Sequence, residues 1–289
     1  MSYRKVIVTG DVFEVYEMER MPKRPQYDRD KDDFMAQVLD TKMMALNPET
    51  RAKAIADGRQ MLREGFKEKE DRKEERRKQT LRNSRDKLKR ISRNNFGPKD
   101  LFVTLTYAEN FADIDLADIH FRDFIEELNE EFNHKHKYIA VREFQERGAI
   151  HFHMLIDLNI TWDRNDHETR EKYERQVHEL FWNHGWVDLK RLDFREEGNH
   201  KKVFNETGEN DNVGAYISKY FETDDSRLNG HKIYLTSKGL EREMTYYGEE
   251  ANKIIEFYNL KQQKKVFTNS YESEYHGNIN YDEYNLKRR

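Results

Sequence analysis

The sequence predicts an α+β fold in which helices pack on a central antiparallel sheet. Between residues 101 and 237, segments with strict apolar alternation, the period of a β-strand, recur several times. Segments with apolar residues three or four positions apart, the period of an α-helix, separate them. The expected order is strand, helix, strand, strand, helix, strand, helix and a final strand, which is related to the ferredoxin-like plan.

Before this region, we expect a hairpin and a charged helical arm. Apolar alternation on both sides of Gly10 predicts a small β-hairpin that caps or edges a sheet. Residues 31–93 combine helix-forming and charged residues with few apolar anchors, which predicts a solvated helical extension. Residues 51–100 contain 18 Lys and Arg and 9 Asp and Glu, a net of +9, so the remainder carries −13 of the total −4. The basic part suits a polyanion, and the acidic remainder leaves room for a cation site.

The main domain is expected to begin after Gly97 and Pro98, which break the helix. Its strands are predicted at residues 101–107, 137–144, 149–158, 186–194 and 231–237, and its helices at 115–132, 173–181 and 212–221. The C-terminal residues are polar and without periodicity, which predicts a mobile tail. We therefore divide the chain into an N-terminal hairpin and arm (1–90), a main domain (91–250) and a helix end with a polar tail (251–289).

The composition excludes several kinds of chemistry. The chain has 289 residues and no cysteine, which removes disulfides, thiolate metal sites and thiol nucleophiles and fits a reducing compartment. No apolar run approaches the roughly 20 residues that span a bilayer, and the N-terminus lacks the core of a signal peptide. We therefore expect a cytoplasmic protein with no membrane partner.

Two histidines inside an apolar strand are the strongest candidate for a functional site. His151 and His153 flank Phe152, so both imidazoles point to the same face of a strand. If the preceding hairpin is centred near Arg147, then Glu143 lies opposite His151, within reach of the same ion. Two neutral nitrogens and a carboxylate suit Mn²⁺ or Mg²⁺, and zinc would also tolerate them. The alternative is that the histidines are core residues bonded to the backbone.

Two tyrosines and a lysine on the helix predicted at residues 212–221 are candidate catalytic residues. Tyr216 and Tyr220 are four residues apart at the edge of the buried helix face, and Lys219 lies on the exposed flank of Tyr216. A phenolate that attacks a phosphodiester needs a cation on the phosphate oxygens and a positive neighbour that favours its ionised form. Alternatively, both tyrosines are amphipathic residues with their hydroxyls in water.

Two further sets of residues are candidates for DNA contacts. Thr104 and Thr106 share one strand face and could bond a phosphate or a residue around the metal, although β-branched residues also suit strands by shape alone. The basic end of the arm would follow a phosphate backbone with an affinity that falls as salt rises. Its residues are Arg82, Arg85, Lys87, Lys89 and Arg90. A solvated helix or a self-association arm would explain the same charges.

Three segments, FVTLTY, GAIHFHML and YISKY, resemble in order and rough spacing the three motifs of HUH-type rolling-circle replication initiators. The most similar group is the Rep proteins of plasmids and phages of Gram-positive bacteria, and the likeness covers residues 3–21 and 91–240. It implies an HUH nickase domain with an RRM-like sheet. By this resemblance, the metal ligands are His151, His153 and Glu143, and the nucleophile is Tyr216, followed by Lys219.

The resemblance also implies an activity and partners. A tyrosine would nick single-stranded or hairpin origin DNA, leaving a 5′-phosphotyrosine and a 3′-hydroxyl that primes synthesis, and a second transfer would rejoin the strands. Many similar proteins have a further lysine where this chain has Thr223, which weakens the case for Tyr220 as a second nucleophile. Since the sequence has no Walker-type loop, a helicase and a polymerase of the bacterial host are expected partners.

Other functions use overlapping features. A relaxase or a single-strand transposase has the same chemistry, but relaxases usually have the tyrosine ahead of the histidines, whereas Tyr216 follows them here. A non-catalytic DNA-binding regulator would keep the sheet and the basic arm. It would bind DNA without a metal and form no covalent adduct.

Overall fold

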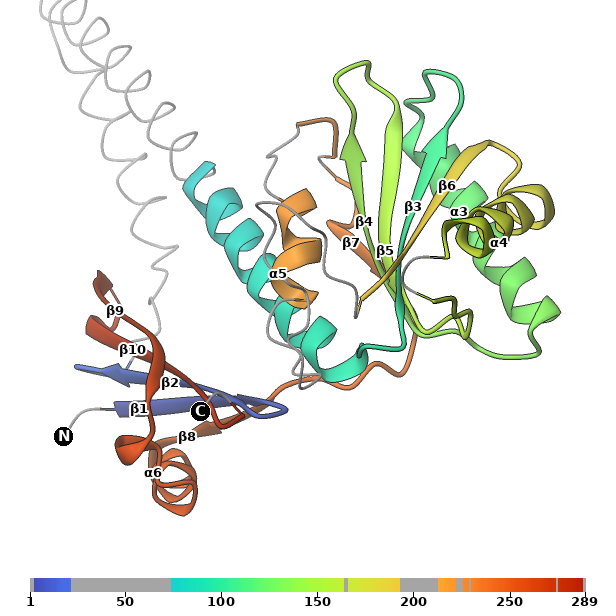
Figure 1. The fold of residues 1–289 in the computed structure, drawn as a ribbon. Helices are drawn as coiled ribbons and strands as arrows, with labels where there is room; N and C mark the ends of the chain where they lie inside the picture. The colour runs from blue at the N-terminus through green and yellow to red at the C-terminus, as the bar shows by residue number, and fades with distance from the viewer. Residues whose placement is uncertain are drawn as a thin grey trace, which may run out of the picture.

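Two five-stranded antiparallel sheets form the framework of the protein, seen in a computed structural model (Figure 1). The structure describes residues 3–21, 74–163, 166–192, 213–221, 226–228, 230–273 and 275–287. The central sheet, with strand order β6-β3-β5-β4-β7, comes from the middle of the chain. The terminal sheet, with strand order β8-β1-β2-β10-β9, combines strands from both ends. The α+β class predicted from the sequence is therefore confirmed.

The central sheet forms where apolar and polar residues alternate. Its strands are β3 (Leu101–Tyr107), β4 (Tyr138–Phe144), β5 (Ile150–Ile156), β6 (Gly185–Arg191) and β7 (Tyr234–Thr236). Gly148, in the loop between β4 and β5, has a φ of +93°, a conformation that side chains with a Cβ rarely adopt. The resulting hairpin places Glu143 opposite His151, as the sequence predicts.

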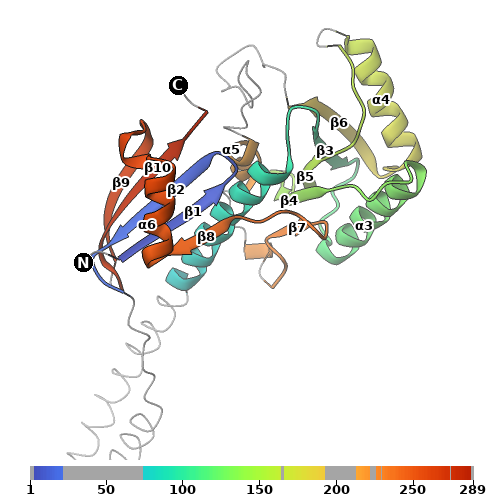
Figure 2. The same ribbon diagram turned by 90° about the horizontal axis from the view of Figure 1, so that it is seen from below.

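Two helices cover one face of the central sheet, here called the back face (Figures 1 and 2). They are α3 (Ile114–Glu131) and α4 (His167–Leu180). The carboxylate of Asp113 begins α3 by accepting a hydrogen bond from the backbone N–H of Leu116 at 3.0 Å. Phe121 of α3 then stacks on Phe152 of β5 with ring centroids 4.7 Å apart. Because Phe152 is buried in this way, its neighbours His151 and His153 point to the other face.

The opposite face, here called the front face, is covered by a helix over residues 74–95 and by α5 (Val213–Ser218). A 3-10 turn, η1 (Lys219–Phe221), continues α5, and a second, η2 (Ser226–Leu228), follows. One apolar cluster joins the two helices to the sheet; its buried members include Leu88, Ile91, Phe102, Leu155, Val213 and Ile217. This cluster holds α5 against the strands that carry the histidines.

The terminal sheet is built from β1 (Tyr3–Thr9), β2 (Val12–Met18), β8 (Met244–Tyr247), β9 (Lys265–Ser273) and β10 (Gly277–Asn285). The helix α6 (Gly248–Phe257) crosses one face of it and is followed by η3 (Leu260–Gln262) (Figure 2). The predicted β1-β2 hairpin forms, but it occupies the interior of this sheet rather than an edge. Its apolar side chains pack on α6.

The expectation of a mobile C-terminal tail is wrong. β10 pairs with β2 along its length, from Ile279 opposite Met18 to Asn285 opposite Val12. The polar composition hid the hairpin because most β9 side chains face solvent, and because the partner strand lies at the other end of the chain. The units predicted at residues 1–90 and 251–289 thus both contribute strands to one sheet.

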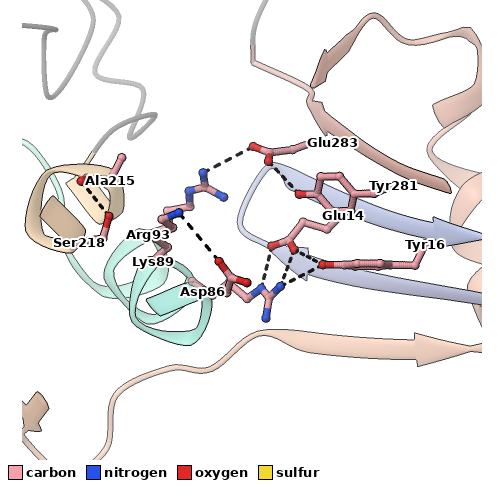
Figure 3. Close-up of polar contacts among 10 residues, drawn as sticks. Glu14, Tyr16, Asp86, Lys89, Arg93, Ala215, Ser218, Tyr281 and Glu283 are labelled. Carbon is pink, nitrogen blue, oxygen red and sulfur yellow. Dashed lines mark hydrogen bonds and ion pairs between the residues drawn. The ribbon is translucent and has the colours of Figure 1, made fainter. Parts of the chain in front are cut away.

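The helix over residues 74–95 lies between α5 and the terminal sheet (Figure 3). Arg90 donates from Nε to Glu14 Oε1 at 2.7 Å and from Nη2 to Glu14 Oε2 at 2.5 Å. Arg93 pairs with Glu283 of β10 at 3.5 Å. Burial would raise the pKa of Glu14, but the hydrogen bonds and charge of Arg90 hold it below its usual value. This helix therefore ties the two sheets together, and the part of the predicted arm before residue 74 lies outside the described residues.

Candidate functional site

The candidate histidines lie on the front face of the central sheet, beneath α5 and η1. In the pairing of β5 with β3, Thr104 is opposite His153 and Thr106 is opposite His151. On the other side of β5, Glu143 is opposite His151. Directly paired residues share a sheet face, so these five side chains form one polar surface. Below, this surface is called the histidine face.

His153 has two polar partners on the histidine face. Its ring is 5% exposed, with Nδ1 3.2 Å from Thr104 Oγ1 and Nε2 2.7 Å from Glu143 Oε2. The hydrogen bond from His153 lowers the pKa of Glu143 below its usual value, more than burial raises it. The hydroxyl of Thr104 thus has a bonding partner in the site, beyond the fit of its shape to a strand.

His151 is chemically different from His153. Its Nε2 is buried and makes no hydrogen bond among the residues that the structure describes. Burial, followed by the charge of the neighbouring His153, lowers the pKa of His151 to about 4. The imidazole is therefore neutral at physiological pH, and its buried Nε2 has no hydrogen-bond partner among the described residues. A buried polar atom of this kind is rare in folded proteins and points to a missing ligand.

The chemical types of these residues suit a divalent ion, but their positions do not form a complete ligand set. Within the described ranges, no three carboxylate or imidazole groups stand close enough together to hold an ion. Glu143 bonds His153, which lies two residues along β5 from His151, the residue directly paired with Glu143. The donor types themselves, two imidazoles and a carboxylate, suit a divalent ion such as Mn²⁺ or Mg²⁺, and zinc would also tolerate them. The unpartnered Nε2 of His151 is the observation that favours such an ion.

Both candidate tyrosines lie over the histidine face. The ring of Tyr220 stacks on that of His153, with centroids 3.6 Å apart and planes 19° apart. Tyr216 meets Phe102 edge to face at 4.7 Å, and the two tyrosine rings are 6.1 Å apart. The helix predicted at residues 212–221 is α-helical only to Ser218 and then tightens into η1, so Tyr220 is in a 3-10 turn. This tighter winding changes the direction of Tyr220 relative to Tyr216.

The two tyrosines have different charged and polar neighbours. Lys219 is exposed, and its Nζ lies 4.7 Å from the ring centroid of Tyr216. Burial raises the pKa of Tyr220, and so do the neighbouring Tyr216 and a hydrogen bond to it. Lys190 of β6 acts on Tyr220 in the opposite direction. Tyr220 is therefore held as a neutral phenol.

Gly214 determines how closely α5 approaches the helix over residues 74–95. A Cβ at this position would lie 2.6 Å from the carbonyl oxygen of Lys89 and 2.7 Å from its Cα. Both distances are too short for a carbon contact, so only glycine permits this crossing. Tyr216 follows in α5 and Tyr220 in η1, so this contact sets the distance of both tyrosines from the histidine face.

The five basic residues predicted to bind DNA do not share one environment. Arg82 is exposed, whereas Lys89 is half-buried and lies 3.9 Å from Asp86. Arg85 and Lys87 are also half-buried. Arg90 is 13% exposed and paired with Glu14, so it is not available to a phosphate backbone. Its role in holding the sheets together replaces the predicted role in DNA binding.

Sequence reasoning did not identify Phe102 as part of the site. This side chain is 1% exposed and contacts three rings, with centroid distances of 4.7 Å to Tyr216, 5.6 Å to Tyr220 and 5.9 Å to His153. The signal was present, because Phe102 alternates in phase with Thr104 on the same strand. Phe102 is a positioning residue that separates the tyrosines from the strand beneath them.

Comparison with known families gives one match. The model of a family described as replication-associated protein ORF2 matches residues 100–225, which run from the start of β3 past η1. Searches of curated proteins and of solved structures found no significant match. The matched region contains the histidine face and both tyrosines, and the match supports a replication initiator. None of the helices in the described ranges has the length and hydrophobicity to cross a membrane.

Proposed function

We propose that the chain is a rolling-circle replication initiator that nicks single-stranded origin DNA by attack of Tyr216 on a phosphodiester. The observation that carries this proposal is the stacking of η1 on the histidine face, with the ring of Tyr220 3.6 Å from that of His153. A core is usually packed from apolar side chains, whereas here a tyrosine helix packs on two histidines and a carboxylate. This arrangement suits a reaction at phosphorus that needs a nucleophile beside a cation site.

In this proposal, His151, His153 and Glu143 would hold a divalent ion, Mn²⁺ or Mg²⁺. A bound ion would polarise the scissile phosphate and neutralise its charge. Thr104, bonded to Nδ1 of His153, fixes the orientation of that ring, as residues around metal ligands commonly do. Reorientation of Glu143 from His153 towards His151 would complete the ligand set.

Tyr216 is the preferred nucleophile because of its neighbours. The ammonium of Lys219 lies 4.7 Å from the ring centroid of Tyr216, where it can offset negative charge that develops on this side chain during attack. Tyr220, which keeps its proton, can donate a hydrogen bond to the Tyr216 oxygen. Attack forms a bond between the Tyr216 oxygen and phosphorus and breaks the bond from phosphorus to the 3′ oxygen. The phenol loses one proton and the 3′ oxygen gains one. One phosphate ester replaces another, so the step is reversible and permits rejoining.

The proposal is tested by a covalent adduct assay. The protein is incubated with labelled single-stranded origin DNA, with Mn²⁺ or with chelator, and a protein–DNA band is sought on a denaturing gel. We expect a metal-dependent band that Tyr216→Phe abolishes and that Tyr220→Phe only slows. Tyr173→Phe, in α4 on the back face, is the matched control and should leave the band unchanged.

Two results would contradict the proposal. Tight binding of origin DNA without any adduct would favour a non-catalytic regulator. An adduct that survives Tyr216→Phe and disappears with Tyr220→Phe would transfer the nucleophile to Tyr220. His151→Ala and Glu143→Gln should each abolish the stimulation by Mn²⁺, and an unchanged response would show that the ion binds elsewhere.

A further inference from the structure

Trp186 is an exposed aromatic side chain beside the histidine face. The chain has three tryptophans, of which Trp162 and Trp182 are buried while Trp186 is 61% exposed. An indole that stays in water does not contribute the large favourable free energy of burying its apolar surface, which is among the largest of any side chain. Such a side chain on a strand is therefore a candidate contact for a ligand.

The position of Trp186 relates it to the proposed reaction centre. Thr106 is paired with Trp186 on one side and with His151 on the other, and His151 is paired with Glu143. These four residues form one row across the front face. Neighbouring strands lie about 4.8 Å apart, so Trp186 is roughly 10 Å from His151 across the sheet. If a phosphate lies at the histidines, the base of a neighbouring nucleotide can reach Trp186 across this distance.

The backbone that carries Trp186 is tightly held. The preceding Gly185 packs so closely that a Cβ would lie 2.1 Å from the carbonyl oxygen of Thr106 and 2.4 Å from the nitrogen of Ala108. The indole N–H of Trp182 also bonds to the carbonyl of Thr106, at 3.2 Å. The following residue, Val187, is buried in the back-face core. Trp186 is therefore an exposed ring on a rigid strand. This favours binding, because the strand loses little conformational entropy when a ligand binds.

The surroundings of Trp186 favour a nucleobase over an apolar protein partner. The row that contains it continues with a threonine, a histidine and a glutamate rather than with further apolar residues. Asp188 and Lys190 follow Trp186 on the same face of β6, at intervals of two residues. The charge of Lys190 acts to lower the pKa of Tyr220. Proteins that bind single strands combine a positively charged groove with aromatic rings on which bases stack, and on this face Trp186 supplies the ring and Lys190 a positive charge.

We propose that Trp186 stacks on a base of single-stranded DNA next to the phosphate bound at the histidine face. This inference rests on the proposed function for the position of that phosphate. Stacking at this point would hold the strand extended across β6 and β3 and would position the scissile bond below Tyr216. It would also favour single strands over duplexes, because the bases of a duplex are already stacked on one another.

Intrinsic fluorescence tests the inference, because Trp186 is the one exposed tryptophan of the three. The full chain is titrated with labelled oligothymidylate and with an abasic oligonucleotide of equal length and charge, in the presence of chelator. Anisotropy reports binding, and indole emission reports stacking. We expect oligothymidylate to quench the emission and to bind more tightly than the abasic strand. Tyr216→Phe, which lacks the nucleophile, should show the same quenching.

Variants complete the test. Trp186→Ala should lose the quenching and bind oligothymidylate about 5- to 150-fold more weakly, the range measured for loss of one stacked base. Trp186→Phe should restore part of the affinity. Phe257→Ala removes an aromatic ring that is 80% exposed on α6 and should change neither signal. Equal melting temperatures would show that the variants are folded.

The outcomes separate this inference from the proposed function. If the wild type forms the covalent adduct but Trp186→Ala binds oligothymidylate as tightly as the wild type, the inference is wrong and the proposed function stands. If stacking and its loss are observed while no adduct forms on any origin, the inference stands and the nicking function is wrong. If the wild type binds no single-stranded DNA, both are wrong.

Discussion

Replacing Gly214 by alanine should displace the tyrosine helix. In an unconstrained helix this change is favourable by up to about 1 kcal/mol, because alanine loses less backbone entropy than glycine. Here the new Cβ would lie 2.6 Å from the carbonyl oxygen of Lys89 and 2.7 Å from its Cα, and both are backbone atoms that cannot rotate away. Forced overpacking of a core contact costs about 1–3 kcal/mol. We therefore expect a net loss of about 0–2 kcal/mol in the free energy of unfolding.

The larger effect of Gly214→Ala should be on function. Relief of the clash requires α5 to move away from the helix over residues 74–95, which shifts Tyr216 and Tyr220 relative to the histidine face. Misplacement of a reacting group by about 1 Å can cost about 100-fold in rate. The adduct-forming rate should therefore fall much more than the stability does, as measured by a single-turnover gel assay and by urea unfolding.

A matched control lies at the next position. Ala215 is exposed on the same helix, so Ala215→Gly should cost about 1 kcal/mol or less through helix propensity and should leave the rate nearly unchanged. If Gly214→Ala proves more stable than the wild type and reacts at the same rate, the close helix crossing does not position the tyrosines and the reasoning is wrong.

Four further changes test the framework of the site. Arg90→Leu leaves Glu14 buried without its partner and should lower the free energy of unfolding by about 3–5 kcal/mol in urea titrations, with partial recovery in the double variant with Glu14→Leu. Because the pKa of Glu14 is lower in the folded protein than in the unfolded chain, its stabilisation is complete above the unfolded value of 4.5 and is lost as the pH falls below it. Glu14→Gln should therefore flatten the acid side of the stability profile, and an unchanged profile would contradict this assignment. Phe102→Ala should cost about 3–5 kcal/mol and slow adduct formation, whereas Thr104→Val should cost only about 1 kcal/mol yet reduce the response to Mn²⁺. For Thr104→Val, a metal titration of the adduct rate is the deciding measurement.

The position of the helix over residues 74–95 gives the terminal sheet a role in the proposed reaction. One side of this helix packs with α5 in the front-face cluster, and the other side forms the ion pairs with Glu14 and Glu283. Replacing both Arg90 and Glu14 by apolar residues of the same size should therefore cost much less stability than removing one partner alone.

Much of the histidine face could be predicted from the sequence. Alternation along residues 101–107 and 150–156 determines which side chains share a face, because the strand period involves only neighbouring residues. The short loop between β4 and β5 determines the register, so the pairing of Glu143 with His151 was predictable as well. These features depend on the chain within a few residues of each position.

Tertiary structure decided the features that depend on distant partners. The pairing of β10 with β2 was hidden because a polar edge hairpin has a weak pattern and its partner lies at the opposite end of the chain. In the sequence Arg90 cannot be distinguished from its basic neighbours, and only the structure shows that it pairs with Glu14. The stacking of Tyr220 on His153 required the close crossing at Gly214, which places the tyrosine helix on the sheet. Local periodicity assigns side chains to faces, whereas packing between distant segments determines which of those faces meet.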